Sequence, residues 1–407
     1  SGMWGKILLV AVLVAGVGAG MSTIGTGRCL ESVARLPLIE HPLADNNHFH
    51  PLSVVPEPEL GESFADPWTG TCIARVSDTG RMRHFYSRID PYNKDGSLIL
   101  AHAPDTGHYH VFRTDRLPYI APENQVGERF ALDDPRWDPD HPNLIWGSDG
   151  FSLVVLDLVS GEKTLVKDFS LDPTVGPIIA AEPDLYRITV KYEGEPSLDF
   201  RYWAFALQGK EDDYRLRHIF CWDREQDRVL GLRSLADEES AIDWVGMSPL
   251  GAWVVIGGLE YNGGGLAGLT IADRELTRFH RVDYTTAHSD VGLDVAGNEV
   301  VVLQNTRTDY VDMVPLNEQT LPILENGGGY QGTGRTRLIR LNYSSSDPGG
   351  LQCGIHVSCN APGWCVVSPY LRHDRQERNW LDRTITLVRL NPDAPKVYAL
   401  AKLHHSY

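Results

Sequence analysis

An all-β fold of the β-propeller class is predicted for this chain by its composition and by an internal repeat. The 407 residues include 39 glycines, 16 tyrosines and 10 tryptophans, a composition that favours short strands joined by tight turns. A polar approach, a turn, and an aromatic or β-branched run then recur together six times. Recurrence at roughly 40–50 residues is typical of propeller blades.

The six repeats are defined by their turns, which lie 47, 58, 50, 46 and 66 residues apart. We expect each turn to join the innermost strand of a blade to the next strand outward, and a third strand to follow. The turns are Gly96, Asn143, Arg201, Gly251, Gly297 and Gly363. The expected third strands are His108–Arg113, Ser152–Asp157, Arg217–Asp223, Gly268–Asp273, Thr336–Leu341 and Thr384–Leu390.

The number of blades is expected to be seven, of which six are directly visible in the sequence. A seventh requires poorly patterned stretches of the chain. The segment Thr71–Asp78 has the pattern of a strand that closes the ring against the C-terminal blade. Because a single blade buries its two faces only against its neighbours, the whole ring is expected to fold as one domain over residues 71–407.

Residues 1–27 form a separate apolar N-terminal segment. The run Ile7–Val17 follows Lys6 and has the layout of a secretory signal peptide, and it is shorter than the roughly 20 residues of a membrane span. Three interpretations stay open: an uncleaved signal behind a vector-derived Ser-Gly, a processed end that anchors in a membrane or packs in a polymer, and a segment folded back on the propeller. Residues 28–70 are interpreted as a linker or a wrapping arm.

Charge and cysteine content favour an exported protein that does not bind nucleic acid. The chain carries 37 basic and 54 acidic side chains, a net charge of −17 that repels phosphate backbones. Its six cysteines are an even number, with three near the last blade and two around the arm, so disulfides are expected in an oxidising compartment. We expect a secreted or cell-surface location, with an extracellular filament as one form of it. The cysteines are Cys29, Cys72, Cys221, Cys353, Cys359 and Cys365.

Several short motifs are spread over residues 80 to 400. They are Phe85–Arg88 before Asn93–Gly96, Asp134–Trp137, Glu193–Ser197 before Arg201–Trp203, and His356–Ser358 before Pro362–Trp364. Together they resemble motifs of secreted bacterial propellers related to polysaccharide lyases, of the oligogalacturonate lyase and ulvan lyase types. The resemblance implies β-elimination on a uronic acid, in which a base removes the proton beside the carboxylate while a cation stabilises the developing charge.

A divalent metal, such as manganese, zinc or calcium, is implied by the same resemblance. The oligogalacturonate lyase pattern places its metal ligands at His288, His356 and Gln352, with Asp290 as a fourth donor. Both histidines are expected just before an innermost strand, so one mouth of the channel is expected to hold them. Gly354 stands where the family has a further histidine. The alternative is that both histidines are hydrogen-bonded channel residues without a metal.

The catalytic base is less well defined by the sequence. Paired histidines followed by tyrosine and arginine occur in ulvan lyases, and the corresponding set here is His84, His102, Tyr202 and Arg217. The alternative for His84 is a structural residue packed near the start of its blade. In the fourth blade, where an oligogalacturonate lyase has a histidine, this chain has Asp243 followed by tryptophan.

Two functions from different classes remain open on the sequence. In the first, Arg88 and Arg136 bind a substrate carboxylate at the channel mouth, and the protein acts on or binds an acidic polysaccharide. Each arginine has the alternative of pairing with an acidic neighbour inside the channel. In the second, the protein is a non-catalytic structural subunit whose residues 1–27 drive filament assembly with copies of itself or anchor it to a membrane.

Overall fold

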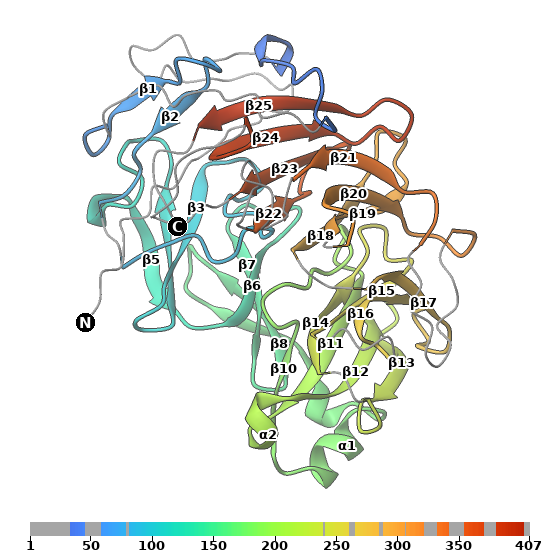
Figure 1. Ribbon diagram of the computed structural model, residues 1–407. Coiled ribbons are helices and arrows are strands. Elements are labelled where there is room, and N and C mark those ends of the chain that lie inside the picture. Colours follow the sequence, from blue (N-terminus) through green and yellow to red (C-terminus); the bar gives the residue numbers. More distant parts are fainter. Residues whose placement is uncertain are drawn as a thin grey trace.

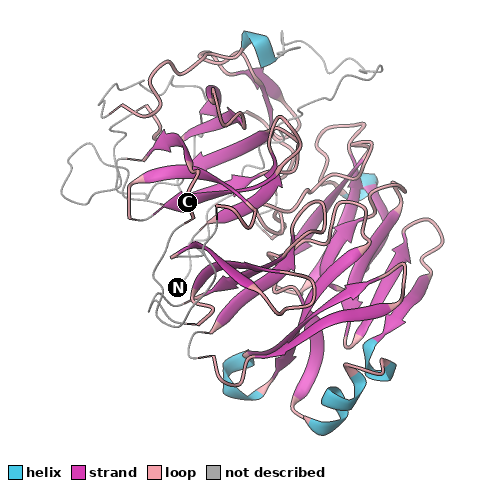
Figure 2. Ribbon diagram, turned by 90° about the vertical axis from the view of Figure 1, so that its right-hand side faces the viewer, coloured by secondary structure: helices cyan, strands magenta, loops and turns pink. Residues whose placement is uncertain are grey.

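The predicted propeller is confirmed by the computed structural model, in which six sheets surround a central channel (Figure 1). The structure describes residues 33–44, 58–78, 81–238, 241–259, 265–284, 288–305, 307–320, 332–341, 354–369 and 380–402. Helical segments in these ranges are short and lie at the periphery (Figure 2). They are η1 (Val33–Arg35), η2 (Pro122–Asn124), η3 (Phe169–Leu171), α1 (Gly176–Ala181) and α2 (Glu211–Tyr214).

Every sheet is antiparallel, and its strands follow one another in chain order from the channel outward. The first three blades contain β3 (Leu98–Ala103), β4 (His108–Arg113) and β5 (Gln125–Phe130); β6 (Asp133–Trp137), β7 (Leu144–Asp149), β8 (Ser152–Asp157) and β9 (Lys163–Asp168); and β10 (Leu185–Thr189), β11 (Tyr202–Gly209), β12 (Leu216–Asp223) and β13 (Arg228–Ser234). In the first blade the innermost position is taken by the chain around Arg83, which bridges to His102.

The next three blades each have four strands. They contain β14 (Ile242–Met247), β15 (Val254–Gly258), β16 (Gly268–Ala272) and β17 (Phe279–Asp283); β18 (Ser289–Leu293), β19 (Glu299–Asn305), β20 (Tyr310–Pro315) and β21 (Thr336–Arg340); and β22 (Ile355–Ser358), β23 (Trp364–Pro369), β24 (Thr384–Arg389) and β25 (Lys396–Lys402).

Glycine turns separate the first two strands of four blades, as the repeat predicted. Gly96, Gly251, Gly297 and Gly363 all have positive φ, between 71° and 82°, a backbone conformation that glycine adopts without steric cost. One expected element is wrong. Thr336–Arg340 is the outermost strand of the fifth blade, and its third strand is β20. Sequence reading missed β20 because Asp312 interrupts its apolar pattern, although this carboxylate is buried and bonded to Asn305.

A two-stranded sheet of β1 (Ser63–Ala65) and β2 (Cys72–Ala74) lies between the last blade and the first (Figure 1). On one side Ile73 packs with Leu387 and Leu400 of the last blade, and on the other Val76 packs with Ile99 of the first. The expectation that Thr71–Asp78 closes the ring against the last blade is therefore met. A seventh four-stranded blade is not confirmed, because the described residues form six blades and this two-stranded sheet.

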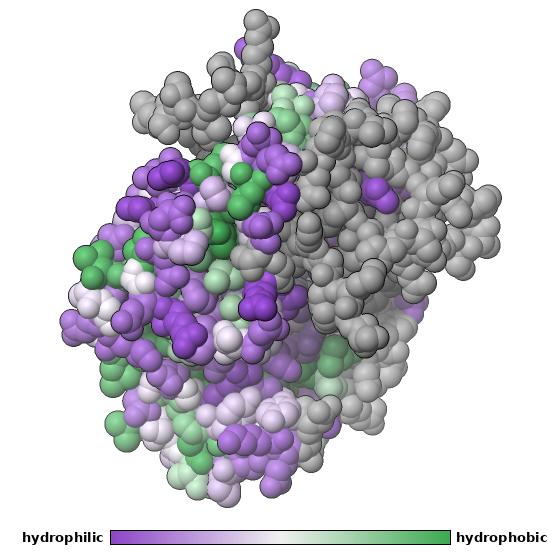
Figure 3. Space-filling view, turned by 90° about the vertical axis from the view of Figure 1, so that its left-hand side faces the viewer, coloured by the Kyte–Doolittle hydropathy of each residue, from purple (hydrophilic) through white to green (hydrophobic). Residues whose placement is uncertain are grey.

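Apolar clusters between neighbouring sheets hold the ring together. Five clusters join consecutive pairs of the six blades, and two more join the β1–β2 sheet to the blades on either side of it. The side of the molecule that carries β1 to β5 is mostly hydrophilic, with apolar residues in separate spots (Figure 3). Burial is thus concentrated at the blade interfaces, which are the contacts that position the channel residues.

Part of the segment interpreted as a linker or wrapping arm contacts the fifth and sixth blades. Leu38 bridges to Tyr398 of β25, and the carbonyl of Pro42 accepts a hydrogen bond from the amide of Arg340. The apolar segment 1–27 lies outside the described residues. Among the residues that are described, no helix is long and apolar enough to cross a membrane.

The cysteines that the structure describes in the blades carry free thiols. Cys221, Cys359 and Cys365 are all buried and unpaired. The expected disulfide pairing of Cys72 remains a prediction, because Cys29 and Cys353 lie outside the described residues.

The closing role of the β1–β2 sheet gives a first prediction. Ile73 is 1% exposed, so Ile73→Ala should lower the free energy of unfolding by about 2–5 kcal/mol, through lost burial and the cavity left between the sheet and the last blade. Urea unfolding measures it. The control Leu171→Ala removes a side chain that is 81% exposed and should change stability by less than about 0.5 kcal/mol. Equal effects of both substitutions would contradict closure by Ile73.

Candidate functional site

One mouth of the channel collects side chains from the beginnings of several innermost strands. Each innermost strand runs in the same direction along the channel, since every blade begins at the channel and ends at the rim. His288 immediately precedes β18, His356 is the second residue of β22, and Asp243 is the second residue of β14. The repeat therefore brings residues that are far apart in the chain to the same end of the channel.

Arg88 lies at the centre of this group. Its side chain is 3% exposed, and its Nη2 donates to Oε2 of Glu193 in the third blade. The guanidinium carbon lies 4.3 Å from the ring centroid of Trp244 in the fourth blade, a cation–π arrangement. Burial opposes the charge of Arg88, but the nearby carboxylates of Glu193 and Asp290 raise its pKa above the usual value. The cation is thus kept charged in a buried position.

A bulge after β10 brings Glu193 into the channel. Lys191 and Tyr192 both have positive φ, 56° and 71°, which is rare for residues with bulky side chains. The buried carboxylate of Asp134 holds this conformation by accepting from the Tyr192 amide at 2.8 Å. The bulge also fits closely against the fourth blade, where a Cβ on Gly194 would collide with the carbonyl oxygen of Val245.

The two predicted metal histidines meet at the mouth. The rings of His288 and His356 are 4.8 Å apart at their centroids and nearly perpendicular, at 85°. Nδ1 of His356 lies 3.1 Å from the Ser87 hydroxyl. Burial lowers the pKa of His356 to about 4, helped by His288 and Arg88, and burial also lowers the pKa of His288. Both imidazoles are therefore neutral at physiological pH and keep a nitrogen lone pair.

Asp243 and Tyr86 complete the mouth. Burial, reinforced by the charge of Glu193, raises the pKa of Asp243 to about 6. Tyr86 hydrogen-bonds to the same glutamate, and burial raises the pKa of its phenol. A carboxyl group that titrates near neutral pH, next to a phenol that stays protonated, is the arrangement expected of an acid–base pair.

The Arg136 guanidinium binds a carboxylate and three backbone carbonyl groups. Its Nε bonds to Oε2 of Glu195 at 2.8 Å, and its other nitrogens donate to the carbonyl oxygens of Pro135, Tyr192 and Gly194. The side chain is 4% exposed. For this arginine the structure favours the alternative in which an acidic neighbour pairs with it inside the channel, and it links the second blade to the third.

The proposed metal donor Asp290 points to a different part of the channel. Its carboxylate accepts from the amides of Val291 and Cys359, and with Arg136 and Glu195 it lines a cavity of about 210 Å³ built from all six blades. Burial raises the pKa of Asp290 to about 7. Gln352 lies outside the described residues. Among those that are described, no group of three or more histidine, cysteine or carboxylate side chains has the arrangement of a metal site.

The set His84, His102, Tyr202 and Arg217 is not brought together. His84 bonds the carbonyl of Ile89 at 2.7 Å, and burial lowers its pKa to about 4, in agreement with the structural alternative. His102 packs against Tyr109, with ring centroids 4.7 Å apart.

Tyr202 and Arg217 lie at opposite ends of the β11–β12 pair, which is about 20 Å at 3.3–3.4 Å per residue. Arg217 is paired with Asp184 there. The ulvan lyase type of catalytic set is therefore not supported by this arrangement.

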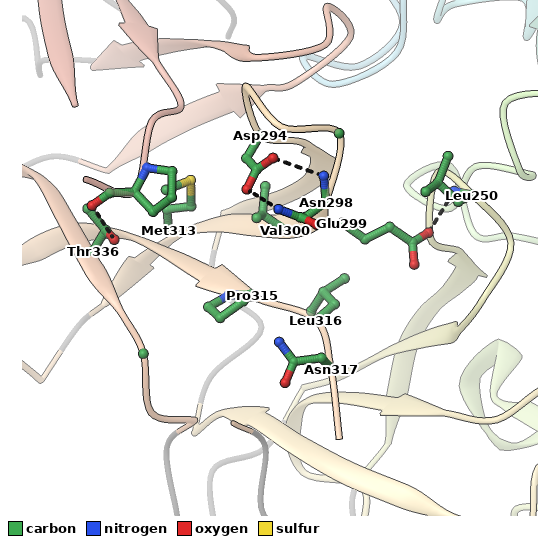
Figure 4. Close-up of a pocket in the computed structure, with 13 residues that line it drawn as sticks. Leu250, Asp294, Asn298, Glu299, Val300, Met313, Pro315, Leu316, Asn317 and Thr336 are labelled. Atoms are coloured by element: carbon green, nitrogen blue, oxygen red, sulfur yellow. Dashed lines mark hydrogen bonds between the residues drawn. The ribbon is translucent and has the colours of Figure 1, made fainter. Parts of the chain in front are cut away.

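A cavity of about 470 Å³ lies in the fifth blade, away from the channel (Figure 4). Its polar groups already bind one another or the backbone: the Asn298 side chain donates to Asp294 at 3.0 Å, and Glu299 accepts from the Leu250 amide at 2.6 Å. Histidine and arginine are absent from its lining. The reactive groups are thus at the channel mouth.

Comparison with solved structures relates this fold to oligogalacturonate lyases. An oligogalacturonate lyase in complex with manganese aligns with a TM-score of 0.51 and 12% identity, over 85% of each chain. A second oligogalacturonate lyase, from Vibrio parahaemolyticus, aligns with a TM-score of 0.52 and 12% identity, also over 85% of each chain. The chain shares the propeller fold of these lyases.

More distant comparisons add no information about function. A TolB-like protein from Agrobacterium tumefaciens aligns with a TM-score of 0.36 and 16% identity over 60% of this chain. No family model matches the sequence, and no curated protein matches it. The likeness to the lyases therefore establishes the propeller fold, and the residues at the mouth carry any functional argument.

Sequence reasoning missed the partners of Arg88. Glu193 belongs to one of the motifs, and Trp244 follows Asp243, where the lyase pattern has a histidine. Neither position predicts a contact with Arg88. Their roles depend on a bulge that no periodic pattern predicts. The signal that was available is the pair of glutamates in Glu193–Ser197, since two carboxylates beside an innermost strand require buried cations.

The Arg88–Glu193 pair gives a second prediction. Arg88→Met should lower the free energy of unfolding by about 3–5 kcal/mol, because Glu193 is left without its cation in a partly buried site. The double variant Arg88→Met/Glu193→Gln should be more stable than Arg88→Met alone. Urea unfolding of the four proteins of this cycle gives the coupling energy. Additive effects would contradict the pairing, and the exposed control Arg113→Met should be near neutral.

Proposed function

We propose that the channel mouth binds a uronic-acid oligosaccharide and cleaves it by β-elimination with a divalent metal. The observation that carries this proposal is the contact between the neutral imidazoles of His288 and His356 at the mouth. Asp243, near the start of the innermost strand of the fourth blade, interacts with Glu193 at the same end of the channel. A related fold that has been solved with manganese adds support of a coarser kind.

The residues present fit two of the ligands of such a metal. Neutral imidazole is a common ligand of manganese and zinc ions, and two rings at 4.8 Å can both direct a nitrogen to one ion. Ser87 contacts Nδ1 of His356 at 3.1 Å and fixes the ring, as second partners of metal-bound histidines do. When bound, the metal would supply positive charge to the substrate carboxylate and to the negative charge that develops on it.

The protein side chains would handle the proton. Asp243, ionised above its pKa of about 6, accepts the proton from the carbon beside the carboxylate. The electron pair of that bond forms the new double bond, and the bond to the leaving oxygen breaks. Tyr86 stays protonated, because burial raises its pKa, and provides a donor for that oxygen. Arg88 holds Glu193 in place and adds a positive field without contacting the substrate.

A structural subunit that assembles through residues 1–27 is the second function considered from the sequence. That segment lies outside the described residues, and no contact among the described residues favours assembly or membrane attachment. Secretion or display at the cell surface belongs to the same proposal, since a polymeric uronic-acid substrate is met outside the cell. The channel mouth therefore carries the functional argument.

The metal gives a third prediction. With polygalacturonate and Mn²⁺ the protein should generate an unsaturated product that absorbs in the ultraviolet, and a chelator should abolish the signal. His356→Ala should reduce the rate by at least about 10–100-fold, the loss that follows when even a partner of a metal ligand is removed. The control His141→Ala changes a side chain that is 70% exposed and should leave the rate unchanged. Absence of product on polygalacturonate and on ulvan would contradict the proposed reaction.

The base gives a fourth prediction. The rate should rise as the pH increases through about 6 and then level off, because Asp243 acts in its ionised form. Asp243→Asn should lower the rate by about 100- to 10,000-fold and remove this pH dependence. Asp105→Asn, in an exposed turn of the first blade, is the matched control and should keep the wild-type profile. A profile that is unchanged in Asp243→Asn would assign the base elsewhere.

A further inference from the structure

We propose that an aromatic surface on the third blade, formed by Tyr186, Tyr192 and Tyr214 with Lys210, binds the part of a uronic-acid chain that extends beyond the channel mouth. This inference rests on the proposed function for the class of the ligand. It adds a binding surface outside the reacting centre, and it predicts a preference for long chains over short ones.

Tyr192 is the inner end of this surface. Its side chain is 41% exposed, although it directly precedes Glu193, the partly buried partner of Arg88. The ring lies edge-on to Phe85 of the first blade, with centroids 5.4 Å apart. The positive φ of Tyr192 is held by Asp134 and by Arg136, which bonds the Tyr192 carbonyl at 3.0 Å. The protein thus keeps a strained backbone and leaves an aromatic ring in solvent beside the mouth, a combination found at ligand sites.

Tyr186 and Tyr214 continue the surface outward. Tyr186 is the second residue of β10, and Tyr214 ends α2, the short helix that follows β11 (Figure 1). Their ring centroids lie 6.1 Å apart, nearly perpendicular, and Tyr214 is 51% exposed. The Tyr186 hydroxyl donates to Gln208 at 2.9 Å, so this ring is fixed. Rigid rings with solvent-facing area supply a contact surface at low entropic cost.

Cationic groups flank the rings. The ammonium of Lys210, an exposed side chain, lies 5.4 Å from the Tyr186 ring centroid, and the guanidinium of Arg187 lies 5.2 Å from the same centroid. Arg187 also pairs with Asp133 at 2.7 Å, so Lys210 carries the charge that is available to a ligand. Sugar rings offer C–H faces to aromatic rings, and uronic acids carry one carboxylate per sugar. The exposed rings match the first feature, and Lys210 is the cation that would meet a carboxylate, although Glu211 and Asp184 lie beside it.

The outer part of the surface lies at the same end of the third blade as the mouth. Tyr186 lies near the beginning of β10 and Lys210 directly after β11, which is the end of the blade where the innermost strands begin. A chain bound at the mouth would therefore pass over Tyr192 first and then reach Tyr186 and Tyr214.

The test is a binding measurement that does not require catalysis. Galacturonate oligomers of two to six sugars are titrated by calorimetry into Asp243→Asn, with and without a second substitution, Tyr192→Ala or Tyr214→Ala. We expect the affinity of Asp243→Asn to rise with the length of the oligomer. Adding Tyr192→Ala or Tyr214→Ala should weaken binding of the hexamer about three- to tenfold. Tyr214→Ala should weaken binding of the dimer less than binding of the hexamer. Tyr192→Phe keeps the ring and should retain the affinity.

Three outcomes would overturn the inference. Hexamer affinity that is unchanged by both alanines excludes the surface, even if the channel residues are needed for the reaction. Recognition of uronic acid is excluded if a neutral hexasaccharide of glucose binds as tightly as the galacturonate hexamer and Lys210→Ala does not change the affinity. Absence of any saccharide binding excludes the surface too. Hexamer binding that depends on Tyr192 and Tyr214, with no unsaturated product from the wild type, would overturn the proposed reaction alone. Product from the wild type, with hexamer affinity unchanged by both alanines, would overturn the surface alone.

Discussion

The buried cation Arg88 is the interaction on which the channel depends. It comes from the first blade and meets Glu193 of the third and Trp244 of the fourth, and its charge influences Asp290 of the fifth and His356 of the sixth. A guanidinium in such a position must be paired, since an isolated buried charge is strongly unfavourable. The pair therefore fixes the bulge of the third blade, and the bulge in turn shapes the mouth.

The same cation sets the chemistry around it. Together with burial it lowers the pKa of the two imidazoles. It also opposes the rise in the pKa of Asp243, which burial and the charge of Glu193 bring to about 6. In the oligogalacturonate lyase pattern a histidine is expected where this chain has Asp243. A carboxylate with a raised pKa supplies the same proton-accepting capacity, so the departure from the family pattern is compatible with elimination chemistry.

The fold was largely predictable because blades repeat. Periodic turns such as Gly251 and Gly297 have positive φ for the reason that the pattern suggested, and six sheets follow from them. The β1–β2 sheet was predictable only as a single closing strand, and β20 was missed because its buried Asp312 gives it no clean apolar pattern.

The site was predictable only in part. Their predicted positions at the starts of innermost strands placed His288 and His356 together, because equivalent positions of different blades face one mouth. The resemblance to ulvan lyases grouped Tyr202 with Arg217, but these residues lie at the two ends of one strand pair. Neither the strand positions nor the resemblance indicated the bulge that carries Tyr192 and Glu193, since irregular backbone leaves no period in a sequence.

The most direct test of a metal-dependent uronate site is the anomalous diffraction of crystals soaked in Mn²⁺. The account predicts a single strong peak in contact with the imidazoles of both His288 and His356, and its loss in crystals of His356→Ala. Fully occupied Mn²⁺ elsewhere on the molecule, with no peak between these two rings, would contradict it.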